Sequence, residues 1–445
     1  MISLTPLRAG LALILVMGLI GLAYTAGARR EPPANPGSRV PEELVPVGVA
    51  ANPSSFEALA GWTRHDPAAA IAALGRSCVQ LLGLPPDAPA NPHEALGPGA
   101  RTSAGQTFAG RAQDWRAACE DATAFLSAPP ADTTGNAARA FFETHFRPVR
   151  LVARMAPKSE PAQIVAHEEK GRFTAYFEPS YPASDRQTTD FSAPVLARPA
   201  DLVTVDLGLF RPELAGQRIA GSVTGGALAP YPDHAAINAG ALQGRTDALA
   251  WMRPGDLLFL QIQGSGRLQI AGAEMRVGYD GHNGHLYTAV GKTLIERGAL
   301  SRETVSMQTI RAWLDAADPG DAAKVRESNR SYIFFRRLDA LPDPSLGPPG
   351  ADGVQLTPMV SLAVDPRWTP LGAPVWVDID GDEPIRQLMI AQDRGGAIKG
   401  PVRGDLYAGS GESAGEFAGA FNRMGTMTLL LPVAGVARLE GAGAP

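Results

Sequence analysis

The chain has 445 residues, 45% of them hydrophobic and 19% charged, which is the composition of an ordinary globular protein large enough for two or three domains. Its 49 glycines and 39 prolines favour many turns and a β-rich architecture over a helical bundle. The net charge of −5 is spread along the chain without a cluster of basic residues, which argues against a nucleic-acid-binding protein.

The N-terminal segment predicts export. Residues 10–28 form an apolar stretch without a charge, and arginines flank it on both sides. Residues 1–28 are therefore a secretory signal peptide or an uncleaved membrane anchor, because the stretch ends in a small-residue cleavage pattern and is also long enough to span a bilayer, which takes roughly 17–25 residues. Residues 29–47 are rich in Pro, Glu, Gly and Ser, which indicates a stiff tether.

Three helical patterns follow the tether. Asp66 followed by Pro67 is a typical helix start and predicts a helix through about residue 82. Two further helices are expected over about 109–126 and 135–146, where apolar residues recur at helical spacing.

The only two cysteines of the chain, Cys78 and Cys119, fall within the first two of these helices. In an exported protein they either form one disulfide or remain as two buried free thiols, and the sequence leaves both alternatives open. Neither has a histidine near it in sequence, so neither is predicted to be catalytic.

After residue 150 the pattern changes to short strands broken by turns, which predicts a barrel or a sandwich. Helices are also expected over about 286–296 and 304–316. The expected strands are RFTAYFEP (172–179), LLFLQIQ (257–263), YIFFRR (332–337), VSLAVD (360–365), PVWVDID (374–380), LMIAQD (388–393) and TLLLPV (428–433).

The densest candidate for a functional site is residues 391–411, where Asp393 and Asp405 bracket a glycine-rich loop that contains Lys399 and Arg403. Glycine lets the backbone approach a substrate closely, and an aspartate at a strand end projects into a groove. The same pattern is also typical of tight β-turns in which Asp caps backbone N–H groups. The loop lacks the Gly-Lys-Ser/Thr ending of a phosphate-binding loop.

Eight short motifs occur in the order found in the family of membrane-bound lytic transglycosylase A, MltA, and the chain resembles that family from about residue 170 to 432. The motifs are Y-F-E-P (176–179), Q-G-S-G-R (263–267), Y-x-G-x-N-G-H-x-Y (279–287), S-M-Q-x-I-R-x-W (306–313), N-x-S-Y-I-F-F (329–335), S-L-A-V-D (361–365), Q-D-R-G-G-A-I-K-G (392–400) and G-D-L-Y-A-G-x-G (404–411).

The resemblance implies a mainly β fold: a double-psi β-barrel domain with an inserted second β-rich domain, a deep groove for a glycan strand between the two, and an N-terminal helical lead-in. The expected division is 48–178 for the lead-in and the first part of the barrel domain, 179–335 for the insert, 336–435 for the rest of the barrel domain with the catalytic loop, and 436–445 for a tail.

The activity that the resemblance implies is cleavage of the bond between N-acetylmuramic acid and N-acetylglucosamine in peptidoglycan without water, which leaves a 1,6-anhydromuramoyl end. The acid/base aspartate of the family matches Asp405, and the upstream aspartate matches Asp393. A single carboxyl group suffices for this reaction, because after protonating the leaving oxygen it can accept the proton of the substrate's own 6-hydroxyl. Asp393 is expected either to orient the loop or sugar or to cap a turn.

Further residues are expected to line the groove. Gln263 and Asn283 offer paired donors and acceptors for N-acetyl and hydroxyl groups, and tyrosines offer faces for sugar stacking, although core packing is the alternative for each tyrosine. Lys399 is either a contact for a peptide-stem or lactyl carboxylate or a solvated loop lysine. The expected substrate-binding set is Tyr176, Glu178, Gln263, Gly264, Ser265, Gly266, Asn283, Tyr287 and Lys399, with Glu178 either a second carboxylate or simply exposed.

No cofactor or metal is expected. His282 and His285 lie three residues apart, yet no third ligand is suggested nearby and the family motif requires only the position of His285. No cysteine lies near the apolar N-terminal stretch, so lipid anchoring through cysteine is excluded. The expected location is the periplasmic cell envelope, with membrane contact through the N-terminal segment only and peptidoglycan glycan strands as the partner.

Two other functions stay open. A glycoside hydrolase would use Asp405 as acid and Asp393 or Glu178 as base for water, with the carboxyl groups roughly 6.5–9.5 Å apart. A non-catalytic glycan-binding or wall-loosening module is the second alternative, because a fold by itself does not determine activity.

Overall fold

A computed structural model describes residues 43–91, 109–128, 135–211, 214 and 217–436. The chain divides into two units, Met1–Leu44 and Val45–Pro445, and the fold described below is that of the second. The predicted signal or anchor segment lies outside the described residues, as does the predicted tail apart from Val436. Within the described ranges, no helix has the length and apolarity needed to cross a membrane.

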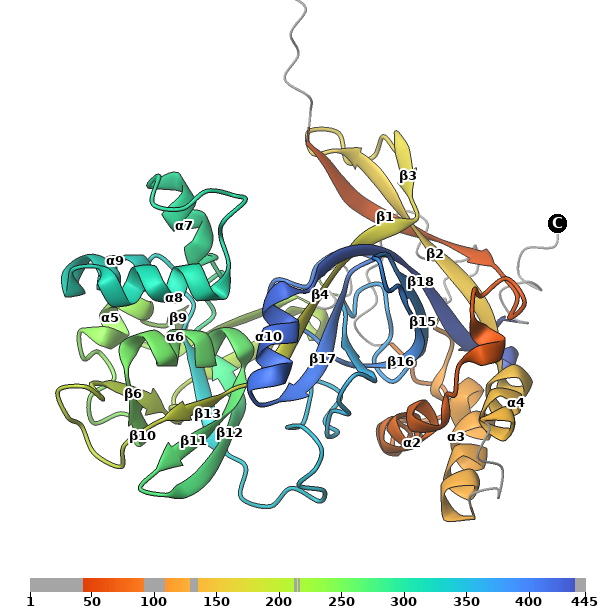
Figure 1. The fold of residues 1–445 in the computed structure, drawn as a ribbon, viewed down its shortest axis with the longest axis horizontal. Helices are drawn as coiled ribbons and strands as arrows, with labels where there is room; N and C mark the ends of the chain where they lie inside the picture. The colour runs from red at the N-terminus through yellow and green to blue at the C-terminus, as the bar shows by residue number, and fades with distance from the viewer. Residues whose placement is uncertain (1–42, 92–108, 129–134, 212–213, 215–216, 437–445) are drawn as a thin grey trace, which may run out of the picture. The chain divides into compact units, whose positions relative to one another are not determined.

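The largest sheet draws its strands from two distant stretches of the chain, and neighbouring strands pair in the order β1-β2-β18-β15-β16-β14-β17-β4, with β3 on β2 (Figure 1). β4 also pairs with β18, so the pairings from β18 through β15, β16, β14, β17 and β4 return to β18 in a closed circuit. The strands are β1 (Leu44–Pro53), β2 (Phe146–Pro157), β3 (Ala166–Glu168), β4 (Lys170–Glu178), β14 (Ser361–Ala363), β15 (Pro374–Ile379), β16 (Ile385–Asp393), β17 (Gly404–Ser410) and β18 (Asn422–Pro432).

Two parallel pairs stand out in this otherwise antiparallel circuit: β14 with β16, and β17 with β4. Parallel pairing requires a long connection between its strands. The whole chain between β4 and β17 supplies this connection, so these two neighbouring strands are more than 200 residues apart in the sequence.

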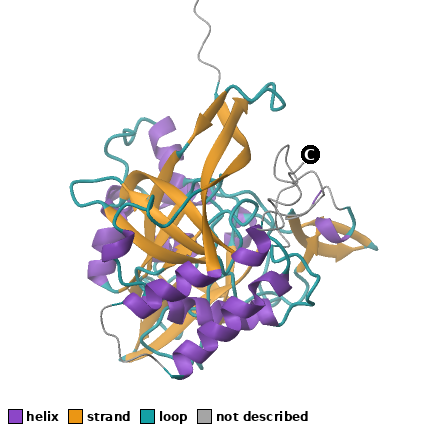
Figure 2. Cartoon of the chain, turned by 90° about the vertical axis from the view of Figure 1, so that its right-hand side faces the viewer, coloured by secondary structure: helices purple, strands orange, loops and turns teal. Residues whose placement is uncertain are grey.

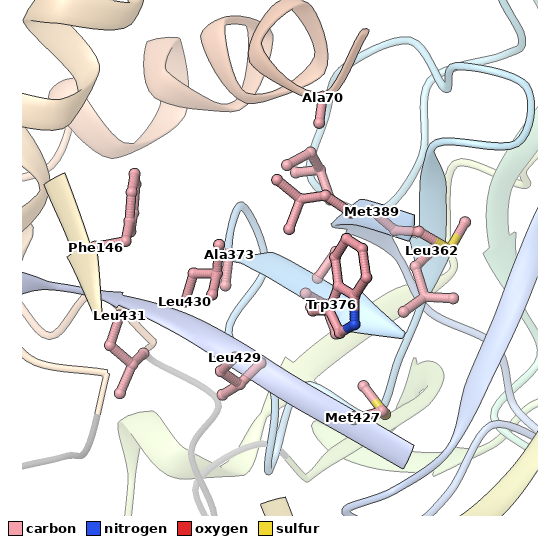
Figure 3. Packing of buried hydrophobic residues seen from close by; sticks show 14 of the residues in the cluster. Ala70, Phe146, Leu362, Ala373, Trp376, Met389, Met427, Leu429, Leu430 and Leu431 are labelled. Carbon is pink, nitrogen blue, oxygen red and sulfur yellow. The ribbon is translucent and has the colours of Figure 1, made fainter. Parts of the chain in front are cut away.

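The main core lies against β15, β16 and β18, whose apolar runs are buried along most of their length. Figure 3 shows side chains of these strands, among them Trp376 and Leu429, packed with Ala70 and Phe146. Near-continuous apolar runs are typical of strands that are covered on both faces. The helices α2 (Ala68–Leu82), α3 (Ala112–Ser127) and α4 (Asn136–His145) contribute buried side chains to the same core.

All three of these helices were expected, and a side chain supports the start of the first. Asp66 Oδ1 accepts a hydrogen bond from the Ala68 N–H at 3.0 Å, which satisfies a free donor at the start of α2. Residues 48–178, expected to hold the lead-in and the first part of the barrel domain, combine these helices with most of β1 and with β2 to β4. The expected tether is also too long at its C-terminal end, since β1 already begins at Leu44.

Cys78 and Cys119 form a disulfide that joins α2 to α3. Their pairing closes a loop with a sequence separation of 41 residues, part of which lies outside the described residues. Of the two alternatives that the sequence left open, a disulfide or two buried free thiols, the structure has the disulfide.

Replacing both cysteines, Cys78→Ser with Cys119→Ser, is expected to lower the free energy of unfolding by about 2–4 kcal/mol, because the unfolded chain regains the freedom that the closed loop removes. Equilibrium urea unfolding measures the change. Reducing agent should shift the midpoint of the native protein and leave that of the double variant unchanged; equal midpoints for oxidised and reduced native protein would contradict the expectation.

The stretch between β4 and β14 forms three smaller sheets and five α-helices among the described residues, so it is mixed rather than β-rich (Figure 1). Figure 2 shows the helices and strands of the described chain as a whole. The sheets are β13-β12-β11-β5, β10-β6 and β7-β8-β9. Their strands are β5 (Ser180–Pro182), β6 (Ala193–Leu196), β7 (Val203–Asp206), β8 (Arg218–Thr224), β9 (Ala227–Pro230), β10 (Ala248–Met252), β11 (Ser265–Ile270), β12 (Ala273–His282) and β13 (Ile333–Arg337). The helices are α5 (His234–Asn238), α6 (Pro254–Gln263), α7 (Val290–Glu296), α8 (Met307–Ala316) and α9 (Pro319–Glu327).

The strand expected over 257–263 is wrong: this segment is the C-terminal part of helix α6. A short apolar run fits a buried strand and a buried helix equally well. The flanking residues decide, because Pro254 stands at the first turn and Gly264, with φ 80°, caps the C-terminus through its N–H to Leu260 O at 2.8 Å. The other expected strands are confirmed, and the helices expected over 286–296 and 304–316 begin later, as α7 and α8.

Candidate active site

Asp405 lies on β17 between the strands β14 and β4. It stands opposite Ala363 of β14 on one side and opposite Thr174 of β4 on the other. Ala363 also stands opposite Asp393 at the end of β16. The two aspartates of the glycine-rich segment are therefore brought together two strands apart, which corresponds to about 10 Å between their Cα atoms.

One carboxylate oxygen of Asp405 is held and the other is available. The Thr174 hydroxyl donates to Asp405 Oδ1 and accepts a hydrogen bond from Arg403 Nη2 at 2.7 Å. Because Thr174 accepts from a permanently charged donor, its own proton is directed to the aspartate. Oδ2 of Asp405 has no hydrogen-bond partner within the described ranges, and the residue is only partly buried.

The environment of Asp405 favours its protonated form. Burial raises the pKa of Asp405 to about 6, while the Thr174 hydrogen bond and the Arg403 charge oppose that rise and the Asp393 charge adds to it. A pKa of about 6 leaves roughly one molecule in ten protonated at pH 7, compared with fewer than about one in a thousand for an ordinary aspartate. Asp405 can therefore act as a general acid near neutral pH.

Asp393 is bound on both oxygens. Oδ2 accepts a hydrogen bond from the Tyr176 hydroxyl at 2.6 Å, and Oδ1 accepts from the backbone N–H groups of Ala351 and Arg394, both at 2.9 Å. Burial raises the pKa of Asp393, and these hydrogen bonds oppose the rise. The arrangement is that of a residue that orients a loop and a tyrosine.

The loop between the two aspartates is tied back to the sheet. Asp365 is buried, pairs with Arg367 at 2.6 Å and accepts a hydrogen bond from the Gly400 N–H at 2.9 Å. This contact holds the segment that carries Lys399, whose own side chain is exposed.

Glu178 is not exposed, contrary to one of its expected roles. Its side chain is 0% exposed, and it receives hydrogen bonds from Arg267 Nε at 3.0 Å and from Arg276 Nε and Nη2 at 3.0 and 2.8 Å. Both carboxylate oxygens are thus occupied, so the geometry makes Glu178 an ion-pair link between β4 and the strands β11 and β12.

Asn283 and the Gln263–Gly266 turn also have structural roles. Asn283 is 1% exposed, and its amide group is bonded to the backbone of Pro232, Arg330, Tyr332 and His285, so none of its polar atoms is available to a sugar. Gln263 Oε1 accepts from Phe177 N–H at 3.3 Å. Ser265 is buried, and a side chain at Gly266 would meet Leu260 at 2.5 Å. Gly264 ends helix α6.

The tyrosines divide into two kinds. Tyr176 is partly buried beside the ring of Tyr407, with 5.3 Å between the ring centroids, and Tyr407 is fully buried. Tyr287 is 40% exposed and keeps a free face. Of the three, Tyr287 has the exposure that sugar stacking needs, and Tyr176 acts through its hydroxyl on Asp393.

Neither histidine of the 279–287 motif belongs to a metal-ligating group. His285 Nε2 lies 2.7 Å from the Tyr231 carbonyl, and His282 Nδ1 accepts from the Gly284 N–H at 3.0 Å. Among the residues that the structure describes, no cluster of three or more His, Cys, Asp or Glu side chains is arranged to hold a metal ion.

The sequence pattern missed Thr174 and the role of Arg403. Both act on Asp405 through contacts between residues about 230 positions apart in the chain. The only available signal was the threonine inside the 172–179 strand, since parallel pairing of β4 with β17 cannot be read from local sequence.

Comparison with protein families finds two matches. Residues 172–336 match the family model described as the MltA specific insert domain, and residues 360–431 match the 3D domain. The first match covers the stretch that contributes the smaller sheets, and the second covers the segment that carries Asp393 and Asp405.

Similar proteins come from several bacteria. Membrane-bound lytic murein transglycosylase A of Escherichia coli K12 is 33% identical over 210 residues, which are 45% of this chain and 56% of that protein. The chain therefore aligns with about half the length of the curated relatives it matches. Among solved structures, the membrane-bound lytic murein transglycosylase of Agrobacterium tumefaciens has a TM-score of 0.69 and 31% identity, covering 88% of this chain and 99% of that one. MltA from Neisseria gonorrhoeae has a TM-score of 0.64 and 28% identity, covering 88% and 95%.

Proposed function

The chain belongs to the MltA family, and from this premise we propose that it is a lytic transglycosylase that cleaves the N-acetylmuramic acid–N-acetylglucosamine bond of peptidoglycan. One observation carries the proposal: Asp405 has one oxygen held by Thr174, a second oxygen without a hydrogen-bond partner among the described residues, and a pKa raised to about 6. No cofactor or metal is part of the mechanism.

The reaction needs only this one carboxyl group. Protonated Asp405 donates its proton to the glycosidic oxygen, and the bond between that oxygen and C1 of the muramoyl residue breaks. The resulting carboxylate then accepts the proton of the 6-hydroxyl as the 6-oxygen bonds to C1, which closes the 1,6-anhydro ring. Asp405 ends protonated, and the internal nucleophile avoids the entropic cost of recruiting water.

A hydrolytic mechanism is less well supported, because it requires a second carboxylate as base or nucleophile. Asp393 uses both oxygens in hydrogen bonds to protein groups, and Glu178 uses both in bonds to Arg267 and Arg276. A non-catalytic glycan-binding module is also less well supported, since it gives no reason for a carboxyl group with a pKa near 6.

The proposal includes an architecture and a location. We propose that the closed circuit of strands is a double-psi β-barrel formed within residues 48–178 and 336–435, with residues 179–335 as the inserted domain and the glycan groove between them. Residues 1–28 would export the enzyme or anchor it, which leaves the folded part in the periplasm with peptidoglycan as its partner. The family name "membrane-bound" of the relatives is consistent with this location.

Mass spectrometry of the products tests the proposed reaction. Purified protein digesting peptidoglycan is expected to release muropeptides with anhydromuramoyl ends, one water lighter than hydrolytic products, because the 6-hydroxyl replaces water as nucleophile. Reducing-end products instead would mean that water attacks C1. Absence of glycan products, together with retained binding to peptidoglycan, would favour the binding module.

A further inference from the structure

Arg394, next to Asp393 in the catalytic loop, is a cation without a partner. It is exposed, and its guanidinium forms no hydrogen bond or ion pair within the described part of the chain. Asp393 forms no ion pair with it, because both oxygens of that carboxylate accept hydrogen bonds from Tyr176 and from backbone N–H groups. The backbone N–H of Arg394 is one of these donors, so its position is fixed by the site itself.

Charges of both signs act on Arg394 at a distance, but none of these groups forms an ion pair with it. Burial lowers the pKa of Arg394, the like charge of Arg218 lowers it further, and Tyr279, Asp393 and Asp206 oppose these effects. Asp206 is already paired with Arg218 at 3.2 Å. The guanidinium of Arg394 thus has no direct carboxylate partner among the described residues, although the charges of Asp393 and Asp206 act on it.

Lys399 adds a second cation to the same loop. It is exposed and has no ion pair with any described residue. Burial has the largest effect on the pKa of Lys399 and lowers it. The charge of Asp365 raises that pKa, and the charges of Arg367 and Arg394 lower it. Asp365 makes its direct contacts with Arg367 and with the Gly400 N–H, so its charge acts on Lys399 only at a distance.

Two side chains of β12, His282 and Tyr279, lie close enough to Arg394 for its charge to affect their pKa values. His282 Nδ1 accepts the Gly284 N–H, which leaves the ring proton on Nε2 as a donor. Burial lowers the pKa of His282, and the charge of Arg394 lowers it further, so the ring is neutral near pH 7. Tyr279, on the same strand, is 47% exposed.

We propose that Arg394 and Lys399 form an anion subsite beside the reacting bond, which binds a carboxylate carried by the muramoyl residue. Guanidinium and ammonium groups without internal partners are suited to such a ligand, and Arg binds a carboxylate through two parallel hydrogen bonds. Asp393 stands about two strand spacings, about 10 Å, from Asp405, so we expect a 3-O substituent of the sugar that is cleaved to extend toward this loop.

This inference rests on the proposed function and narrows its substrate. The muramoyl residue carries a lactyl group, whose carboxylate is either free or joined to a peptide stem with carboxylates of its own. N-acetylglucosamine has no such group. The subsite would therefore make the enzyme prefer muramoyl glycans to neutral chitin-type oligomers.

Binding measurements with a variant that cannot turn over test the subsite. The full chain with Asp405→Asn is titrated calorimetrically with four tetrasaccharides: an N-acetylglucosamine oligomer, a muramoyl glycan with free lactyl carboxylates, the same glycan with these carboxylates amidated, and a muramoyl glycan bearing peptide stems. Adding Arg394→Gln is expected to weaken anionic ligands about tenfold and neutral ones less than twofold, and adding Lys399→Gln is expected to weaken the anionic ligands further. Arg186→Gln, an exposed arginine in the 183–191 loop, is the matched control and should change none of the four.

The outcomes separate the sources of the carboxylate. Loss confined to the glycan with free lactyl groups assigns the subsite to the lactyl carboxylate, and loss confined to the stem-bearing glycan assigns it to the peptide. Equal weakening of neutral and anionic glycans, no weakening, or no binding of any anionic glycan overturns the proposal. If native protein releases anhydromuramoyl products but Arg394→Gln does not weaken binding, the subsite is wrong and the proposed function stands. If Arg394→Gln weakens binding of anionic glycans but native protein releases no glycan products, the subsite stands and the proposed function is wrong.

Discussion

Asp405→Asn is expected to lower kcat for peptidoglycan cleavage by about 10³-fold or more, because it removes the group that both donates and accepts the proton. Asparagine keeps the size of the side chain and can still accept the Thr174 hydrogen bond on its oxygen, so the fold is retained. Release of soluble muropeptides from purified peptidoglycan measures the loss. Turnover near the native rate in a folded variant would mean that another group is the acid.

The same residue sets the pH dependence of the native enzyme. Only the protonated form of Asp405 can donate, so kcat/KM should fall as the pH rises through about 6, by about tenfold per pH unit beyond it. Because Asp405 also acts as the base in the second step, no second group has to be ionised beforehand, and kcat/KM should not fall on the acidic side of the pH profile. A hydrolase with a separate carboxylate base would show a bell-shaped profile instead.

Stability supplies an independent check on Asp405. Its pKa is higher in the folded chain than in the unfolded chain, so ionisation destabilises the fold as the pH rises through about 6, and this penalty is absent below about pH 4. Asp405→Asn should therefore raise the free energy of unfolding at pH 8, on the order of 1–3 kcal/mol, and not at pH 4.

Asp393→Asn is the matched control for the catalytic assignment. It is expected to reduce activity less than Asp405→Asn, because Asp393 acts on Tyr176 and the loop and not on the reacting bond. Complete loss of activity in this variant, with Asp405→Asn still active, would exchange the two roles.

Glu178→Gln is expected to destabilise the protein by about 3–5 kcal/mol, because it leaves the charges of Arg267 and Arg276 without their buried partner. Arg276 also donates to the Leu346 carbonyl at 3.2 Å, so the ion pair joins β4 both to the strands β11 and β12 and to the chain that leads into β14. Urea unfolding monitored by tryptophan fluorescence measures the effect.

Glu274 provides the control for Glu178. It contacts the same Arg267 at 3.4 Å, but its side chain is 39% exposed, and exposed pairs contribute about 0.2–1 kcal/mol. Glu274→Gln should therefore change stability little. A loss of similar size in both variants would show that burial is not what makes the Glu178 pair important.

Several features could be predicted from the sequence because their causes are local. Asp66 and Pro67 mark the start of α2, and the β-forming run of residues 172–178 is the strand β4. The prediction of a strand over 257–263 was wrong for a local reason too. A short, mostly apolar run of seven residues does not distinguish a strand from a helix, and the deciding residues, Pro254 and Gly264, lie outside the run.

By itself, the sequence determined the mainly β class, the order of the family motifs and the two aspartates of the glycine-rich segment. The tertiary structure decided what each residue does there. Parallel pairing of β4 with β17 puts Thr174 and Arg403 on Asp405, and burial turns Glu178 and Asn283 from expected sugar contacts into satisfied internal groups. Burial and long-range strand pairing depend on residues far apart in the chain, so no local pattern encodes them. They raise the pKa values of Asp405 and Asp393, and they occupy both oxygens of Asp393 and of Glu178.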